Sequence, residues 1–366
     1  MNQLLDRVKS SARDKQPEQL ERLGAEIQAL RRLSPQDARF DSLMANLRLL
    51  EGREKEAGEL FDMALAKAPT EHNALLHKID EQVKAGDYEQ VLKYIDILLR
   101  RWPEEFERLK PMLLGIAGKD GAGQLMLELL ASRPPYWRQV LKLYLTTHAG
   151  LDLAKRLLLM AHSEGSPLPE KDAANILYAL LRAGKAPAAY RTFLLTLKPE
   201  EKTRMGYVFD PGFTAKADLR PFTWSVRNTA DADVTLPWRG GRETGGLMVQ
   251  FRNAPTRLAT IRQILMLPPS SYKLRVRATA RLLTAPRGLF WDIQCREKNG
   301  KSLVRLQIPE GSYKNRTLET TFSVPAACLT ELLVLRTGLS TPTWSARYQG
   351  EAIFHEVTIT RQDSEQ

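Results

Sequence analysis

Few residues in this sequence are suited to redox or metal chemistry. Its 366 residues include two cysteines, Cys295 and Cys328, and five histidines that show no metal-ligand spacing. Phosphate-loop and nucleophile-elbow patterns are also missing, so nucleotide-dependent and serine-hydrolase chemistry find no support. We therefore expect no metal site, no cofactor and no enzyme activity.

Long apolar runs are missing as well. No stretch approaches the about 20 continuous apolar residues that a membrane-spanning helix needs, so we expect no transmembrane segment in the chain as given. Residues 1–7 lack the basic region and the following apolar region of a secretory signal. Apolar residues make up 43% and charged residues 27% of the chain, which is typical of soluble globular domains.

The positive charge of the chain is uneven. The formal net charge is +11, and residues 205–366 hold 22 Lys and Arg against 14 Asp and Glu. Seventeen of those 22 cations are Arg, whose planar guanidinium binds carboxylates and phosphates in a bidentate manner. This favours an acidic ligand for the C-terminal part, and a basic surface that only maintains solubility is the alternative.

Helix-breaking residues repeat every 34 residues in the first half of the chain. Pro35, Pro69 and Pro103 are 34 apart, and glycines repeat the same spacing at 52 and 86 and again at 150 and 184. Between Gly52 and Pro69, small or apolar residues recur at the spacing of one buried helical stripe. The period predicts an array of helical hairpins over residues 1–203.

The second of these units resembles the tetratricopeptide repeat family at Ala57, Phe61, Ala64 and Pro69. The resemblance implies an α-solenoid whose concave groove binds a protein partner. The candidate groove residues are Asn46, Asn73 and Asp80, and simple solvated polar positions are the alternative.

β-branched and aromatic residues replace the helical pattern from about residue 204 onward. The clearest strand covers 272–282, where apolar residues alternate with Lys273, Arg275, Arg277 and Arg281. Seven further strands are predicted at 247–252, 260–267, 289–296, 303–308, 318–324, 332–337 and 352–360. Short strands at this spacing predict an antiparallel β-sandwich of the jelly-roll type over 204–366. Cys295 and Cys328 lie near strand ends, where they form either a bridge or two reduced thiols.

Residues 206–362 resemble the jelly-roll carbohydrate-binding modules appended to polysaccharide enzymes. The resemblance rests on the segments 210–213, 222–224, 265–278 and 353–359, and it is closer still to C-terminal domains behind tetratricopeptide scaffolds in bacterial exopolysaccharide systems. It implies glycan binding, with Trp224, Trp344, Arg275, Arg277 and Arg281 as candidate contacts. The arginines favour an acidic polysaccharide as the glycan. Because His355-Glu356 replaces the paired Asp of related modules, we predict no calcium.

These patterns together predict a non-catalytic adaptor in bacterial polysaccharide biosynthesis or export. A purely protein–protein adaptor is the first alternative, and a polysaccharide-active enzyme with a helical accessory domain is the second. Specific nucleic-acid binding is not expected. The expected location of the protein depends on where its native start lies. If that start lies upstream of Met1, the periplasmic side of the envelope is favoured, and otherwise the cytoplasm.

Overall fold

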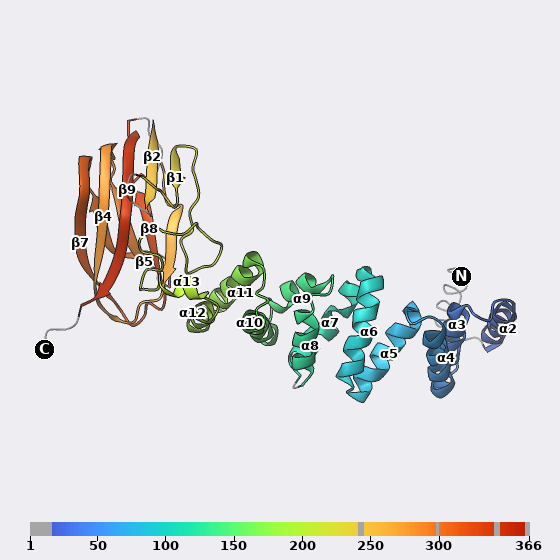
Figure 1. Cartoon of the computed structure of the whole chain (residues 1–366). Coiled ribbons are helices and arrows are strands. Elements are labelled where there is room, and N and C mark those ends of the chain that lie inside the picture. The colour runs from blue at the N-terminus through green and yellow to red at the C-terminus, as the bar shows by residue number, and fades with distance from the viewer. Residues whose placement is uncertain (1–16, 120, 241–244, 298–299, 340–344, 363–366) are drawn as a thin grey trace. The chain divides into compact units, whose positions relative to one another are not determined.

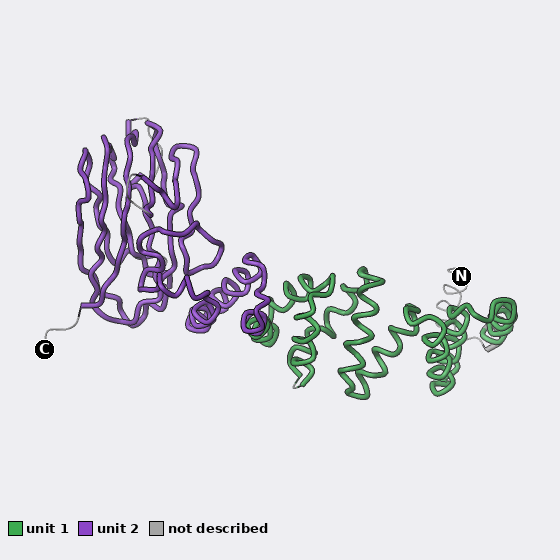
Figure 2. Tube along the Cα trace, in the orientation of Figure 1, with its two compact units in different colours: residues 1–157 green, residues 158–366 purple. Residues whose placement is uncertain are grey.

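Helices form the first part of the chain and antiparallel strands the last part, which confirms the predicted α-then-β fold class (Figure 1). By packing, the chain divides into two compact units, Met1–Leu157 and Leu158–Gln366 (Figure 2). The last helices therefore belong to the same unit as the strands, and the boundary expected between residues 203 and 204 stays a prediction. The structure is a computed structural model that describes residues 17–119, 121–240, 245–297, 300–339 and 345–362.

The helices of the first unit bury one apolar face each. In α4 the stripe of Ala57, Phe61 and Ala64 is buried, and it packs against Ala45 and Ala74 from the neighbouring helices. The helices are α2 (Pro17–Leu33), α3 (Ala38–Leu50), α4 (Glu54–Lys67), α5 (His72–Ala85), α6 (Tyr88–Arg101), η1 (Pro103–Glu105), α7 (Phe106–Ala117), α8 (Ala122–Ala131), α9 (Trp137–Tyr144) and α10 (His148–Ser163), whose second half enters the second unit. In the described part of the chain, no helix is both long and apolar enough to cross a membrane.

The glycines of the 34-residue period have two different roles. Gly52, Gly86 and Gly184 adopt φ values of +76°, +77° and +73°, a left-handed conformation that glycine adopts without strain at helix ends. Gly150 instead lies inside α10, where a Cβ atom would come within 2.6 Å of the backbone of Tyr144. The shared period thus reflects helix endings at three positions and close packing at the fourth. The tetratricopeptide assignment itself stays a prediction.

Aromatic packing explains why the last helices share a unit with the strands. Phe193 of α12 contacts Phe209 and Phe222, with ring centroids 5.5 and 5.4 Å apart, and Tyr190 lies 5.0 Å from Phe222. The segment before the first strand therefore packs on α12. The helices of this unit are α11 (Glu170–Arg182), α12 (Ala186–Leu195) and α13 (Pro199–Lys202).

Two antiparallel sheets follow, one with the strand order β1-β2-β9-β4-β7 and the other with β3-β8-β5-β6. All eight strands expected from the sequence are present, and the four-residue β1 is an additional one. The strands are β1 (Ala232–Thr235), β2 (Leu247–Ala254), β3 (Ile261–Leu265), β4 (Ser270–Thr284), β5 (Leu289–Cys295), β6 (Lys301–Ile308), β7 (Gly311–Val324), β8 (Glu331–Thr337) and β9 (Tyr348–Arg361).

The two sheets share a single apolar core, which makes them a β-sandwich. Val276 of β4 and Phe354 of β9 belong to the same buried cluster as Trp291 of β5 and Leu333 of β8. The chain changes sheet at most strand connections, as it does in a jelly roll. One face of each sheet is therefore buried, and the other is left for contacts outside the core.

Candidate functional site

β4 carries four cations on the face of the five-stranded sheet that points away from the core. Lys273, Arg275 and Arg277 alternate with buried apolar residues, as the sequence pattern predicted, and Arg281 follows buried Ala280. Leu282, which the same alternation placed on the core face, is instead 79% exposed, because the register of β4 shifts at this point. Because a strand rises about 3.4 Å per residue, successive members of this row are spaced by about 7 Å or a multiple of it. The structure thus brings the three predicted arginines together on one surface, which we call the outer face.

Each of these arginines meets a carboxylate on a neighbouring strand. The partners lie directly opposite in the strand register, and the hydrogen bond from Arg275 lowers the pKa of the Glu319 carboxyl. Lys273 approaches the same glutamate, 3.7 Å away. The outer face is therefore a ladder of ion pairs with a small positive excess, and not a row of bare cations. The pairs are Arg275 with Glu319 at 2.6 Å, Arg277 with Glu356 at 4.0 Å and Arg281 with Glu351 at 3.2 Å.

A bulge in β9 places a histidine beside this ladder, and a tryptophan from the segment between β1 and β2 lies next to that histidine. Arg277 pairs with Glu356 and Ala278 with Phe354, so His355 is the extra residue of the bulge. Its Nε2 lies 2.8 Å from the Thr279 hydroxyl, and its ring centroid is 6.3 Å from that of the half-buried Trp238. Sequence reasoning missed this corner, because only the register between strands far apart in the chain places these side chains together.

Planar polar side chains continue across the sheet from this corner. Exposed Gln250 of β2 lies opposite Glu351 in the register, and Asn315 of β7 donates its backbone N–H to the Thr279 hydroxyl. Guanidinium, carboxylate and amide groups offer donors and acceptors in fixed planes, while an indole offers a broad apolar surface with one polar group. The outer face can therefore bind a ligand that has both hydroxyl groups and apolar patches.

Of the two predicted tryptophan contacts, the structure describes Trp224, which does not lie on this face. Trp224 is only 2% exposed, its ring packs 4.8 Å from Phe213 and 5.7 Å from Trp291, and its Nε1 donates to the backbone oxygen of Asp210. A ring enclosed in this way has no surface left for a sugar, so we correct Trp224 from a candidate contact to a core residue. Trp344 lies outside the described residues.

The three groove candidates of the helical unit have separate surroundings. Asn46 donates its side-chain amide to the backbone oxygen of Ser42 in the same helix, and Asp80 forms an exposed ion pair with Lys84 at 2.7 Å. Asn73 lines a hollow of about 590 Å³, and the other two are not among the residues around it. Their role in binding a partner stays a prediction.

This hollow, which we call the α5 hollow, is acidic. His72 lies 2.8 Å from a carboxylate oxygen of Glu105 and 5.2 Å from the ring centroid of Trp102. Buried Glu71 accepts hydrogen bonds from the Ser42 hydroxyl and the Ala74 amide. Four carboxylates and one guanidinium therefore line the hollow, and this excess of negative charge favours a positively charged ligand. They belong to Asp37, Glu71, Glu104, Glu105 and Arg39.

The cysteines form a disulfide between Cys295, at the end of β5, and Cys328, in the turn before β8. Their Cα atoms are 5.6 Å apart, a usual distance for a bridge. Both residues are buried in the sandwich core. The bridge therefore fastens two neighbouring strands of the four-stranded sheet.

Comparisons with known proteins identify similar folds at low sequence identity. No family model and no curated protein matches the chain. Among solved structures, a module described as CBM4 is 18% identical and covers 36% of this chain and 78% of its own, with a TM-score of 0.26. The CBM22-1 xylan-binding domain of Paenibacillus barcinonensis Xyn10C is 14% identical and covers 38% and 85%, also with a TM-score of 0.26.

A third similar structure, TmCBM61 in complex with β-1,4-galactotriose, is 10% identical and covers 43% of this chain and 99% of its own, with a TM-score of 0.28. Because all three TM-scores are below 0.5, we do not transfer the ligands of these proteins to this chain. The functional proposal below is argued from the chain's own residues.

Proposed function

We propose that the β-sandwich binds a glycan across the outer face and that the helical unit binds a protein partner, so that the chain is a non-catalytic adaptor. The observation that carries the proposal is the ladder of Arg–Glu pairs beside Trp238 and His355. Its place in bacterial polysaccharide biosynthesis or export rests only on the sequence resemblance of residues 206–362.

The ion pairs of the outer face are easily opened by a ligand. Their side chains are 24% to 62% exposed, and exposed ion pairs contribute only about 0–1 kcal/mol each. Sugar hydroxyls can therefore insert between Arg and Glu at low cost and bond to both. The sequence alone favoured an acidic glycan. Because the carboxylates offset most of the positive charge of the outer face, a neutral glycan can bind there equally well.

Binding of the full chain to a panel of neutral and acidic oligosaccharides tests the proposal. Arg277→Ala and Trp238→Ala should weaken binding at least tenfold, since each removes a central contact, while Trp238→Tyr should retain most of it. Arg262→Ala is the matched control, because Arg262 is an exposed arginine on β3 of the other sheet. Equal binding by all variants, or no binding by the parent, would leave the protein–protein adaptor as the better hypothesis.

The α5 hollow is the proposed docking point for the protein partner. Its excess of carboxylates and the ring of Trp102 suit a segment rich in Lys or Arg, because cations bind both groups. A labelled basic peptide should bind in a salt-dependent manner, and Glu104→Lys should weaken it. Glu89→Lys on α6, which is exposed and outside the hollow, should bind like the parent. If both variants behave alike, the partner binds elsewhere.

The enzyme alternative has a direct test. Incubating the chain with the oligosaccharides that it binds and measuring new reducing ends distinguishes a binding module from a polysaccharide-active enzyme. If the chain is a non-catalytic adaptor, we expect it to form no more new reducing ends than the Arg277→Ala variant does.

A further inference from the structure

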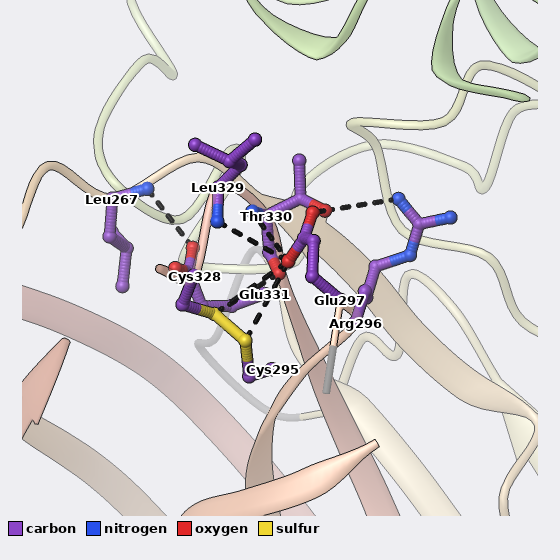
Figure 3. Close-up of a disulfide and its surroundings, with 8 residues drawn as sticks. All are labelled: Leu267, Cys295, Arg296, Glu297, Cys328, Leu329, Thr330 and Glu331. Carbon is purple, nitrogen blue, oxygen red and sulfur yellow. Dashed lines mark hydrogen bonds between the residues drawn. A yellow bond between two sulfur atoms is a disulfide. The ribbon is translucent and has the colours of Figure 1, made fainter. Parts of the chain in front are cut away.

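The disulfide lies beside a carboxylate that the backbone holds in place (Figure 3). Glu297 Oε2 accepts hydrogen bonds from the amides of Leu329 and Thr330 at 3.3 and 3.2 Å, and its Oε1 accepts one from the Thr330 hydroxyl at 2.7 Å. The same Oε2 lies 3.6 Å from the sulfur of Cys295 and 3.8 Å from that of Cys328. Two sulfurs and one carboxylate oxygen thus meet at one point.

These distances match the ligand spacing of a tetrahedral zinc site. With Zn–S of about 2.3 Å and Zn–O of about 2.1 Å, a sulfur and an oxygen ligand lie about 3.6 Å apart. Two thiolates on the same zinc lie about 3.8 Å apart. The oxygen of Glu297 is therefore already at the required distance from both sulfurs, and only the two sulfurs have to separate.

The frame around the cluster does not depend on the disulfide. Cys295 lies opposite Glu331 in the β5–β8 register, and the Arg296 amide donates to the Thr330 oxygen at 3.1 Å. Together with the hydrogen bonds of Glu297, these contacts join the end of β5 to the turn before β8. Cleavage of the bridge therefore leaves both cysteines and Glu297 next to one another.

A second carboxylate, that of Glu331, belongs to the residue opposite Cys295 in the β5–β8 register. Glu331 is fully buried, and its Oε2 accepts a hydrogen bond from the Leu267 amide at 3.0 Å. Its Oε1 is buried without a hydrogen-bond partner among the described residues. A buried carboxylate oxygen that lacks a donor is costly in a protein interior, and a nearby cation offsets part of that cost.

We propose that the reduced protein binds one zinc ion through Cys295, Cys328 and Glu297, with water in the fourth position. In the reduction, a dithiol transfers two electrons and two protons to the disulfide, giving two thiols, and is itself oxidised to a disulfide. Zinc then displaces the two thiol protons and binds two thiolates and the Glu297 carboxylate. The cysteine pair thus forms a bridge under oxidising conditions and a metal site under reducing conditions. The sequence did not predict this site, because Cys328 lies 33 residues from Cys295.

Metal titration of the full chain tests this proposal. The protein is reduced with a phosphine, freed of reductant without oxygen and titrated with Co²⁺, whose sulfur-to-metal charge-transfer band reports thiolate binding. We expect one Co²⁺ per reduced chain, its displacement by Zn²⁺, and no such band for the oxidised chain or for the Cys295→Ser/Cys328→Ser variant.

The Glu297→Gln variant separates the three-ligand site from binding by the thiols alone. Loss of a second-sphere contact already costs about 10–100-fold in metal affinity, so loss of this ligand should weaken zinc binding at least tenfold. Glu59→Gln, at an exposed glutamate on α4 of the first unit, is the control and should bind zinc like the parent. The proposal is wrong if the reduced parent binds no metal, if Glu297→Gln binds equally well, or if circular dichroism shows that reduction unfolds the sandwich.

Discussion

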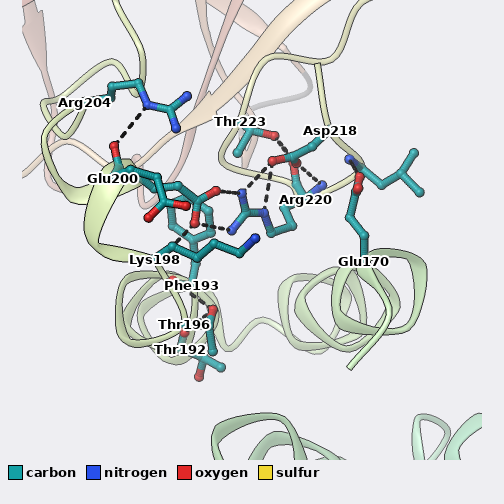
Figure 4. Close-up of polar contacts among 12 residues, drawn as sticks. Glu170, Thr192, Phe193, Thr196, Lys198, Glu200, Arg204, Asp218, Arg220 and Thr223 are labelled. Atoms are coloured by element: carbon teal, nitrogen blue, oxygen red, sulfur yellow. Dashed lines mark hydrogen bonds and ion pairs between the residues drawn. The ribbon is translucent and has the colours of Figure 1, made fainter. Parts of the chain in front are cut away.

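Replacing Arg220 by methionine should destabilise the second unit by about 3–5 kcal/mol, the cost of breaking a buried ion pair by removing one partner. The guanidinium donates hydrogen bonds to Glu201 of α13 and to Asp218 of the following segment, and the latter contact is seen in Figure 4. The three side chains are only 13%, 14% and 20% exposed. Methionine keeps the apolar part of the side chain, but it removes the guanidinium, whose carbon lies 5.3 Å from the centroid of the Phe193 ring, and leaves the two carboxylates without this cation.

The pH dependence of this loss follows from Glu201. Burial alone raises the pKa of its carboxyl, but hydrogen bonds from Arg220 and from the Lys198 amide outweigh burial, so that its pKa is lowered. A carboxyl whose pKa is lowered by folding stabilises the folded state at pH values above 4.5, its ordinary pKa. This stabilisation is lost as the pH falls through the folded-state pKa. The difference between parent and Arg220→Met should therefore be largest near pH 7 and should shrink below about pH 4.5.

Equilibrium urea unfolding of the full chain, followed by tryptophan fluorescence, measures this difference. The matched control is Arg252→Met, since the Arg252–Asp233 pair has a distance of 2.6 Å but side chains that are 55% and 40% exposed. Exposed pairs contribute about 0–1 kcal/mol, so the control should change little. If the two variants lose the same free energy of unfolding, or if the loss is independent of pH, the reasoning about the buried network is refuted.

Three further predictions concern the sandwich. Gly350→Ala should lower the melting temperature more than Gly311→Ala. Both glycines have a positive φ, but only at Gly350 would a Cβ atom lie 2.2 Å from a backbone oxygen, that of Leu282. Equal shifts in melting temperature would contradict this. Trp291→Ala should cost about 3–5 kcal/mol of unfolding free energy in urea, since the ring is fully buried, and a loss below 1 kcal/mol would contradict its central place in the core. Burial raises the pKa of the Glu331 carboxyl from 4.5 to about 7. The ionised carboxylate therefore lowers the free energy of unfolding increasingly as the pH rises from 4.5 to 7, and by about 3 kcal/mol at higher pH. Glu331→Gln should therefore exceed the parent in stability at pH 8.5 but not at pH 5 in denaturant titrations.

The sequence predicted the features that depend on local periodicity. The alternation over 272–282 placed Arg275, Arg277 and Arg281 on one face correctly, because successive side chains of a strand point to opposite sides. It was wrong for Leu282, where the register of β4 shifts. Likewise, the buried stripe of α4 followed from helical spacing. These properties require no knowledge of which segments meet in space.

Features that depend on long-range register could not be predicted. The ion pair of Arg275 with Glu319 joins residues 44 positions apart, and only the pairing of β4 with β7 identifies it. The bulge that places His355 beside Thr279 depends in the same way on β4 and β9. Trp224 lies outside the named strands, so no alternation indicated whether it faced the core or the solvent.

The position of β7 bears on the behaviour of the protein at high concentration. This strand is 14 residues long and ends the five-stranded sheet, and long edge strands act as templates for aggregation. Here the exposed residues Lys314, Arg316 and Glu319 carry charge, and Asn315, with a φ of +50°, lies where the register with β4 shifts. A second chain that added a strand at this edge would have to desolvate those charges and match an irregular backbone. The edge therefore opposes sheet-to-sheet polymerisation while its side chains stay open to a ligand.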